Sequence, residues 1–175
     1  MKNIIISLSL FYATVFSAQV AIGKPAVSSP AVSLEFYDNA DNTKGIILPW
    51  VSSTAAVNGA VNGTLIYNTS DKKIYVKYAS LLKDLSVDTT GTVTTTLQDS
   101  LTDNATAKVV IGGNPVTDTT PGILVLADSN KAMVLPKVNS PHLNMVNPSP
   151  GMMVYDPVKK QLAVFNGTVW SFWKP

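Results

Sequence analysis

Short stretches of alternating apolar and polar residues run through the chain and predict β-strands. In residues 32–37 (VSLEFY) and 74–78 (IYVKY) every second residue is apolar, so each stretch predicts a strand with one buried face. After residue 19 no segment sustains the 3.6-residue apolar period of an amphipathic helix. The pattern therefore predicts an all-β fold built from short strands.

Two parts of the sequence resemble each other in order, spacing and residue type. Residues 44–51 (KGIILPWV) correspond to 131–138 (KAMVLPKV), offset by 87. Residues 63–76 (GTLIYNTSDKKIYV) correspond to 151–164 (GMMVYDPVKKQLAV), offset by 88. The intervening loop absorbs the single-residue difference. Repetition of this kind indicates a duplicated unit.

Both units predict the same succession of strands and turns. A leading apolar strand at 32–38 aligns with residues 123–128. A second strand then ends at Pro49 or Pro136, since proline cannot donate to a ladder and suits a strand exit. A polar loop follows, which in the first unit can hold one helical turn. Two more strands come next, joined by a turn rich in Asn, Asp or Pro.

The last hairpin is predicted to differ between the units. Asn166-Gly167 indicates a two-residue type I′ turn, in which both residues take positive φ, with Thr168–Trp173 as the returning strand. The first unit has Tyr78 and Ala79 at the corresponding place. We therefore expect its last hairpin to be altered or lost.

These signals divide the chain into four regions. Residues 1–18 form a leader, 19–78 the first β unit, and 121–175 the second β unit. Residues 79–120 are rich in Thr and Asp and read as a polar connector with one short strand near 108–111. The units are short β-meanders and hairpins.

The leader has the build of a secretory signal peptide. Lys2 gives a short positive region, an apolar run covers Ile4–Phe16, and small Ser17 and Ala18 follow. A membrane-spanning helix needs about 20 apolar residues, and this run is shorter. We expect cleavage after Ser17 or Ala18, with no membrane span after the leader is removed.

The second unit resembles a recurrent pattern of bacterial secreted surface-stalk proteins and phage tail-fibre proteins. Residues 109–138 are similar to a VGIG-x-x-x-P lead-in, an aliphatic strand and KGxLLPRV. Residues 148–173 are similar to its sequel, xGLxVYNTxTNxLxxYDGTxWV. Residues 31–78 cover the middle of the pattern. The arginine after Leu-Pro is replaced by Trp50 in one unit and Lys137 in the other.

The resemblance implies a β-rich, elongated, often homotrimeric protein that serves in attachment or display. Phage fibres lack signal peptides as a rule, so the leader favours a bacterial secreted protein.

Composition removes most catalytic chemistry. The chain of 175 residues has 13 Lys and no Arg, 10 Asp and one Glu, no Cys and a single His. Nucleic-acid recognition favours the arginine fork, so a net charge of +2 without arginine argues against such a partner. No cysteine nucleophile, thiolate metal site or disulfide is available. We expect no cofactor and no enzyme activity.

Two local patterns are weighed as chemistry and set aside. His142 is the sole histidine and has no nucleophile motif around it, so it is read as an exposed loop residue. Residues 38–42 (DNADN) carry oxygen ligands of the kind calcium prefers, but without the spacing of a calcium loop. They are read as a turn.

Four aromatic residues are the candidate interface or ligand-stacking positions. They are Trp50, Trp170, Phe172 and Trp173. Aromatic rings anchor protein interfaces and also stack on sugars. In a small β protein a core or interface role is the more frequent one.

Physical reasoning gives its own argument for assembly. Three- or four-stranded meanders have one apolar face and little within the chain to cover it, so threefold association would bury those faces and edges. The sequence thus predicts a non-catalytic, fibre-like attachment protein that forms a homotrimer. It is secreted or displayed on the outer surface of a Gram-negative bacterium, with a surface glycan or protein as its external partner. The alternative is a monomeric carbohydrate-binding module that uses the C-terminal aromatics.

Overall fold

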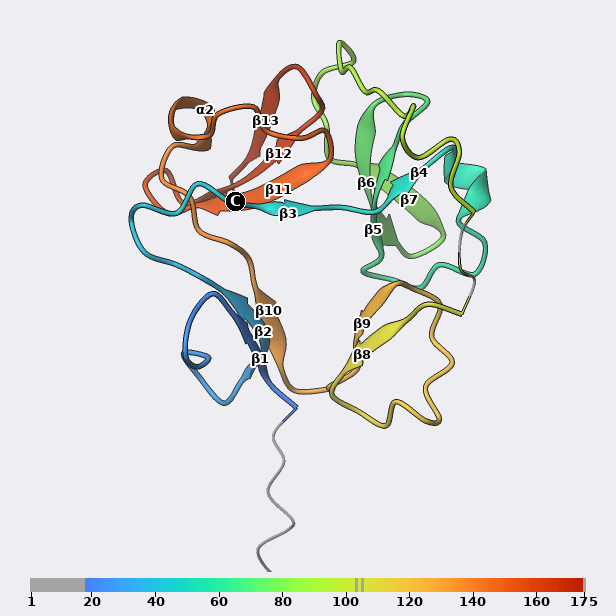
Figure 1. The fold of residues 1–175 in the computed structure, drawn as a ribbon, viewed down its shortest axis with the longest axis vertical. Helices are drawn as coiled ribbons and strands as arrows, with labels where there is room; N and C mark the ends of the chain where they lie inside the picture. The colour runs from blue at the N-terminus through green and yellow to red at the C-terminus, as the bar shows by residue number, and fades with distance from the viewer. Residues whose placement is uncertain (1–17, 103, 105, 175) are drawn as a thin grey trace, which may run out of the picture.

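The computed structural model describes residues 18–102, 104 and 106–174, and it is built of β-strands (Figure 1). In these residues thirteen short strands form four sheets, together with one 3₁₀ turn and one short α-helix, which confirms the all-β prediction. All but the last residue of the predicted leader lies outside the described residues. No helix in the described part of the chain is long and apolar enough to cross a membrane.

The elements follow one another closely along the chain. The strands of its first part are β1 (Val20–Ile22), β2 (Val32–Phe36), β3 (Ile46–Ile47), β4 (Trp50–Val51), β5 (Leu65–Asn68), β6 (Lys73–Tyr78) and β7 (Leu81–Asp84). Those of its second part are β8 (Val109–Ile111), β9 (Leu124–Leu126), β10 (Ala132–Val134), β11 (Met152–Asp156), β12 (Gln161–Phe165) and β13 (Trp170–Trp173). The 3₁₀ turn η1 is Thr54–Ala56 and the helix α2 is Pro141–Asn144.

The four sheets differ in size. Sheet A has the order β1-β2-β10, sheet B β13-β12-β11-β3, sheet C β4-β5-β6-β7 and sheet D β8-β9. In Figure 1 the four-stranded sheets B and C lie side by side in the upper half, and sheets A and D lie below them.

In both halves of the chain, the residue that follows Leu-Pro pairs with a tyrosine in the first strand of an antiparallel run. Trp50 pairs with Tyr67 in parallel, and Lys137 pairs with Tyr155 in parallel. The Tyr67 N–H donates to the Pro49 carbonyl, and the Tyr155 N–H donates to the Pro136 carbonyl, both at 2.9 Å. From there the antiparallel run β5-β6-β7 matches the run β11-β12-β13.

The leading strands correspond as well, further upstream than the sequence comparison reaches. β1 pairs with β2 in parallel, and β8 pairs with β9 in parallel. Gly23 follows β1 with φ 77°, and Gly112 follows β8 with φ 81°. A positive φ is the conformation that glycine adopts without strain, so both glycines turn the chain at the same point. We call residues 19–86 the first segment and 108–174 the second segment.

The two segments exchange one strand each. β3, from the first segment, pairs with β11 of the second, with Ile47 opposite Met152. β10, from the second segment, pairs in parallel with β2 of the first, with Met133 opposite Leu34. Neither segment therefore completes its sheets alone.

The main core lies between sheets B and C. Its buried residues come from both segments and are Leu48, Tyr67, Ile74, Met153 and Val164. The expectation that each meander lacks a cover within the chain is wrong for these faces, because the two segments cover each other. A second core of Val138, Val154 and Ala163 lies on the other face of sheet B, with Met145, Trp170 and Phe172 packed against it.

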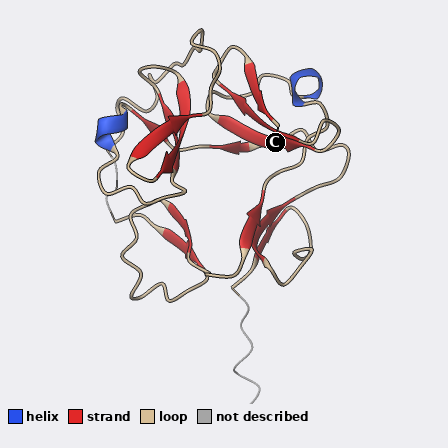
Figure 2. Cartoon of the chain, turned by 180° about the vertical axis from the view of Figure 1, so that it is seen from behind, coloured by secondary structure: helices blue, strands red, loops and turns tan. Residues whose placement is uncertain are grey.

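The short helices occupy corresponding places and lie at opposite sides of the molecule in Figure 2. The turn η1 confirms the helical turn expected in the first loop, and the Ser53 hydroxyl caps it by accepting the Ala56 N–H at 3.2 Å. In the second segment α2 begins with Pro141, whose fixed φ suits the first helical position.

Strand β2 is buried on both faces, so the expectation of one polar face is wrong. Ser33 and Glu35 are as inaccessible as Leu34, because other parts of the chain lie over that face, with the Ser33 hydroxyl donating to Asp128 at 3.0 Å. The Glu35 carboxylate accepts from the Lys24 ammonium at 2.9 Å and from the Ser28 N–H at 2.6 Å. Burial acts to raise the pKa of Glu35, but these hydrogen bonds outweigh it and hold the pKa below its usual value.

The two closing hairpins differ from each other, and the second differs from expectation. Asn166 does not take a positive φ, whereas Gly167 does, so the predicted type I′ turn is wrong. Phe165 pairs with Trp170, and the returning strand therefore begins at Trp170 rather than Thr168. The first segment's hairpin is altered, as one of the two expectations has it, and not lost: only two residues separate Tyr78 from its partner Leu81, whereas four separate Phe165 from Trp170.

The kept hairpin extends sheet C beyond the predicted first unit. Ala79 adopts a positive φ of 51°, and this turn leads the chain back into β7. β7 therefore falls within residues 79–120, which the sequence assigned to the connector. The four-region division itself stays a prediction.

The buried Glu35 predicts a loss of stability in acid. Because its folded-state pKa is lowered, its contribution is present above the unfolded value, about 4.3, and is lost as the pH falls through the folded value. Glu35→Gln should flatten the stability curve between about pH 5 and pH 3. Urea unfolding at several pH values measures this. The exposed control Asp99→Asn should keep the wild-type slope, and an unchanged slope in Glu35→Gln would contradict the assignment.

Candidate assembly surface

The four candidate aromatics do not form one platform. Trp50 lies on β4 in sheet C, and Trp170, Phe172 and Trp173 lie on β13 at the edge of sheet B. Side chains alternate along a strand, so Trp170 and Phe172 share one face of β13 and Trp173 points to the other. The structure thus brings two of the four together.

Trp170 and Phe172 pack within their own chain. The Trp170 ring lies 5.2 Å from Phe165 between centroids, and Phe172 meets the His142 ring edge-on at 5.6 Å. Both residues pack against the second core. His142 is exposed and lies on α2 rather than in a loop. Its ring thus serves as an edge contact for Phe172.

Trp50 and Trp173 use their indole N–H groups to tie separate segments. Trp50 donates to the Pro150 carbonyl at 3.0 Å and lies 5.9 Å from Tyr67. Trp173 donates to the Leu85 carbonyl. A buried indole that has found such a partner is held in place. All four candidate residues are half-buried by contacts of this kind.

The first part of the predicted connector fastens to the last hairpin. The Val87 N–H donates to the Ser171 hydroxyl at 3.0 Å, and the Thr168 hydroxyl donates to the Thr90 carbonyl at 2.9 Å. The Thr92 hydroxyl donates to the Gly167 carbonyl at 3.1 Å. These side-chain bonds hold the segment against sheet B, and Val93 of the same segment packs against the main core.

Asn166 is the centre of this attachment, and sequence reasoning assigned it only to a turn. Its side-chain oxygen accepts the N–H groups of Thr168 and Val169 at 2.9 and 2.8 Å, which closes the loop. Its carbonyl accepts the buried Tyr67 hydroxyl at 2.9 Å, which joins sheets B and C. Burial of that phenol raises the pKa of Tyr67 to about 12, so it stays a hydrogen-bond donor at neutral pH. The Asn-Gly pair was a signal for the loop, but nothing in the sequence pointed to the bond with Tyr67.

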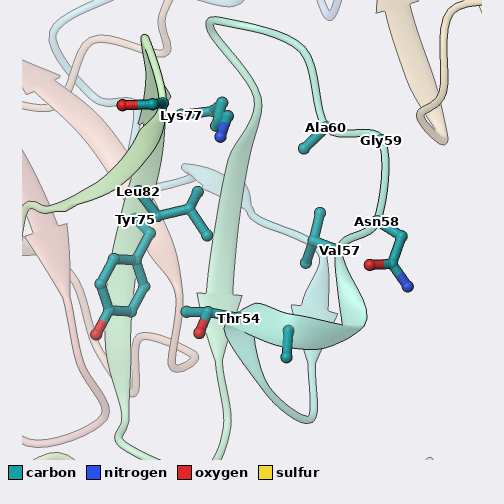
Figure 3. A pocket seen from close by; sticks show the side chains of 10 residues that line it. Thr54, Val57, Asn58, Gly59, Ala60, Tyr75, Lys77 and Leu82 are labelled. Atoms are coloured by element: carbon teal, nitrogen blue, oxygen red, sulfur yellow. The ribbon is translucent and has the colours of Figure 1, made fainter.

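A groove of 510 Å³ opens on the outer face of sheet C (Figure 3). Tyr75, Lys77 and Leu82 line it from the sheet, and the segment around η1 forms its other wall. The corresponding face of the second segment is filled by the second core. The two segments therefore share a fold but carry different side chains on this outer face, which is open in the first segment and filled in the second.

The Tyr75 hydroxyl beside the groove is engaged within the chain. The Tyr75 hydroxyl donates to Asp71 at 2.7 Å. Burial, together with this bond and the charge of Asp71, raises the pKa of Tyr75. The phenol therefore keeps its proton at neutral pH and remains a hydrogen-bond donor.

The Asp38 turn also has an internal role. Its carboxylate pairs with Lys24 and with Lys137, both at 3.3 Å, and these hydrogen bonds lower the pKa of Asp38. The nearby Asn42 amide donates to the Lys137 carbonyl at 3.0 Å. The turn thereby fastens the first segment to the strand exit of the second. Among the described residues no group of three or more His, Cys, Asp and Glu could hold a metal ion.

These features define an all-β protein whose two segments are joined by exchanged strands and whose aromatics pack internally. Residues 113–174 match the family model described as the phage tail like trimerisation region. The match begins in the turn after β8 and takes in the rest of the second segment. It supports a phage tail-fibre-like family and a homo-oligomeric state for the chain. No curated protein and no solved structure matches the chain.

Substitution of Gly167 tests the attachment of the connector to the last hairpin. Its φ is 102°, and a Cβ there would run into the Thr92 carbonyl. Gly167→Val should destabilise the chain by at least about 2 kcal/mol, because a β-branched residue is strained at that φ and displaces Thr92. Thermal and urea unfolding measure the loss. Lys159→Ala, in an exposed neighbouring turn, is the matched control and should change stability by less than about 0.5 kcal/mol.

Proposed function

We propose that the protein is a non-catalytic structural module of an elongated, fibre-like homotrimer that is exported and serves in attachment at the cell surface. The match of residues 113–174 to a phage tail like trimerisation region carries the proposal. The leader-like residues 1–18 support export. The similarity of residues 31–78 to the second segment supports a duplicated unit.

The internal contacts favour this role over the carbohydrate-binding alternative. A stacking platform needs aromatic rings that share an exposed face. Trp170 and Phe172 pack against the second core instead, and Trp173 points to the opposite face of β13. No observation favours a sugar site at the C-terminal aromatics.

The oligomeric state tests the proposal directly. Analytical ultracentrifugation of the purified chain at several concentrations should give the mass of a trimer, because trimerisation is the role of the matched family. A chain that stays monomeric at tens of micromolar would overturn the proposal.

Export has its own test. Amino-terminal sequencing of secreted material should begin at Ala18 or Gln19, since the apolar run ends just before them. Mature protein that still begins at Met1 in the membrane fraction would contradict export.

A further inference from the structure

The exchanged strands β3 and β10 each use only one of their two edges. They occupy corresponding positions in the two segments, yet β3 pairs with β11 whereas β10 pairs with β2. Because the strands correspond, their two pairings together show what each edge of such a strand binds. One edge binds the first strand of the antiparallel run, as β3 binds β11. The other edge binds the leading strand, as β10 binds β2.

Two sheet edges lack the strand that their counterparts carry. β11 carries β3, but the matching edge of β5 beside Leu65 carries no strand within the described ranges. β2 carries β10, but β9 is paired only with β8 in that same part of the chain. The vacancies match the unused edges of β10 and β3.

The backbone N–H and C=O groups of β5 point in the directions that such a pairing needs. The Lys77 N–H donates to the Thr64 carbonyl at 2.8 Å, so Thr64 faces β6. Backbone groups of an antiparallel strand alternate between its two edges, which turns the N–H and C=O of Leu65 to the open edge. Met153 is the corresponding residue of β11.

The occupied edge of β11 shows the register. The Leu48 N–H donates to the Gly151 carbonyl at 3.0 Å, and Ile46 lies opposite Met153. By the alternation of the antiparallel ladder, Ile46 and Met153 are therefore a hydrogen-bonded pair.

The backbone of β10 is directed in the complementary way. The Ala132 N–H donates to the Ala31 carbonyl at 2.9 Å, on the side of β2. The register with β2 shifts between Ala132 and Met133, and the extra residue, Ser33, lies in β2 rather than in β10. The alternation therefore continues along β10 and turns the backbone groups of Met133 to the other, unused edge. Met133 corresponds to Ile46, and Leu65 corresponds to Met153, so the two free edges have the register of the pair already formed.

We propose that β10 of one copy of the chain pairs antiparallel with β5 of a second copy, with Met133 opposite Leu65 and Val134 opposite Thr64. The same correspondence adds β3 in parallel to β9 of a neighbouring copy, with Ile46 opposite Leu124. Apolar side chains are exposed there: Ile47 is 51% exposed and Leu124 is 47% exposed. This inference rests on the proposed trimer and names the surfaces that build it.

A contact of this kind can close into a ring. Donor and acceptor are different surfaces of the chain, so the interface is heterologous, and such interfaces form rings when the rotation closes. Three chains close it when neighbours are related by 120°. Each added strand also covers an edge that would otherwise pair without control.

A pair of cysteines tests the register in a chain that has none of its own. Residues 64 and 134 form a non-hydrogen-bonded pair in the proposed ladder, with Cα atoms about 4.5 Å apart, which a disulfide spans. The variant Thr64→Cys with Val134→Cys should form covalent dimers and trimers on mild oxidation. The products are read by non-reducing electrophoresis and mass spectrometry.

The matched control moves one cysteine by two residues. Thr64→Cys with Ala132→Cys places the thiols on a diagonal of about 7–8 Å, too far for a disulfide, and should stay uncrosslinked. Equal crosslinking of both variants would overturn the register. A disulfide that closes within one chain would overturn the pairing between copies.

Amide hydrogen exchange of the unmodified chain gives a second test that needs no variant. The Leu65 and Met133 amides should be protected by at least tenfold in the assembled protein relative to dilute monomer. The Met153 amide, bonded to β3 inside the chain, should be protected in both. Trimers by ultracentrifugation with unprotected Leu65 and Met133 would sink this inference and leave the proposed function standing, whereas a permanent monomer would remove both.

Discussion

The pairing of β3 with β11 and of β10 with β2 is the constraint on which the fold depends. A buried backbone group without a partner costs free energy, so each short strand must lie against another. β3 has two residues and β10 three, too few to be stable by themselves. By exchanging them, the two segments satisfy these groups and place Leu48, which follows β3, in the main core. Sheets B and C face each other because of this exchange.

Hydrogen bonds from side chains complete what the exchange begins. The buried Tyr67 hydroxyl reaches the Asn166 carbonyl across the main core, and Lys137 reaches Asp38 between segments. Each bond joins residues more than ninety positions apart in the chain. Such long-range contacts make the two segments one folding unit rather than two separate domains joined by a linker.

The sequence carries the local structure better than the long-range structure. Alternation located most of β2 and β6, and proline marked the ends of the strands near Pro49 and Pro136. These features follow from covalent geometry and from burial of neighbouring residues. The burial of Glu35 did not follow, because alternation assigns a polar residue to the exposed face and does not show that Lys24 and Ser28 fold over it. The turn at Asn166 departed from the Asn-Gly pattern because its side chain bonds Thr168 and Val169.

The candidate site shows the same division. The sequence singled out Trp50, Trp170, Phe172 and Trp173 by type, but strand alternation and the path of the connector decide which way each ring points. No residue type marks the free edges of β5, β9 and β10, because an edge is a property of the backbone and of what fails to pair with it. Those edges became visible only when corresponding strands of the two segments were compared.

A chain that already covers its inner faces can still be built for assembly. The face-to-face burial of sheets B and C stabilises the single chain, since apolar area removed from water is the main favourable term. Strand edges instead determine how a neighbouring strand is oriented, because a ladder forms only in one register and one orientation. The two functions are thereby separated: side chains in the core hold the chain, and backbone edges choose its neighbour. That separation also lets the outer faces diverge, with a filled core on sheet B and an open groove on sheet C, while the backbone register of corresponding strands stays the same.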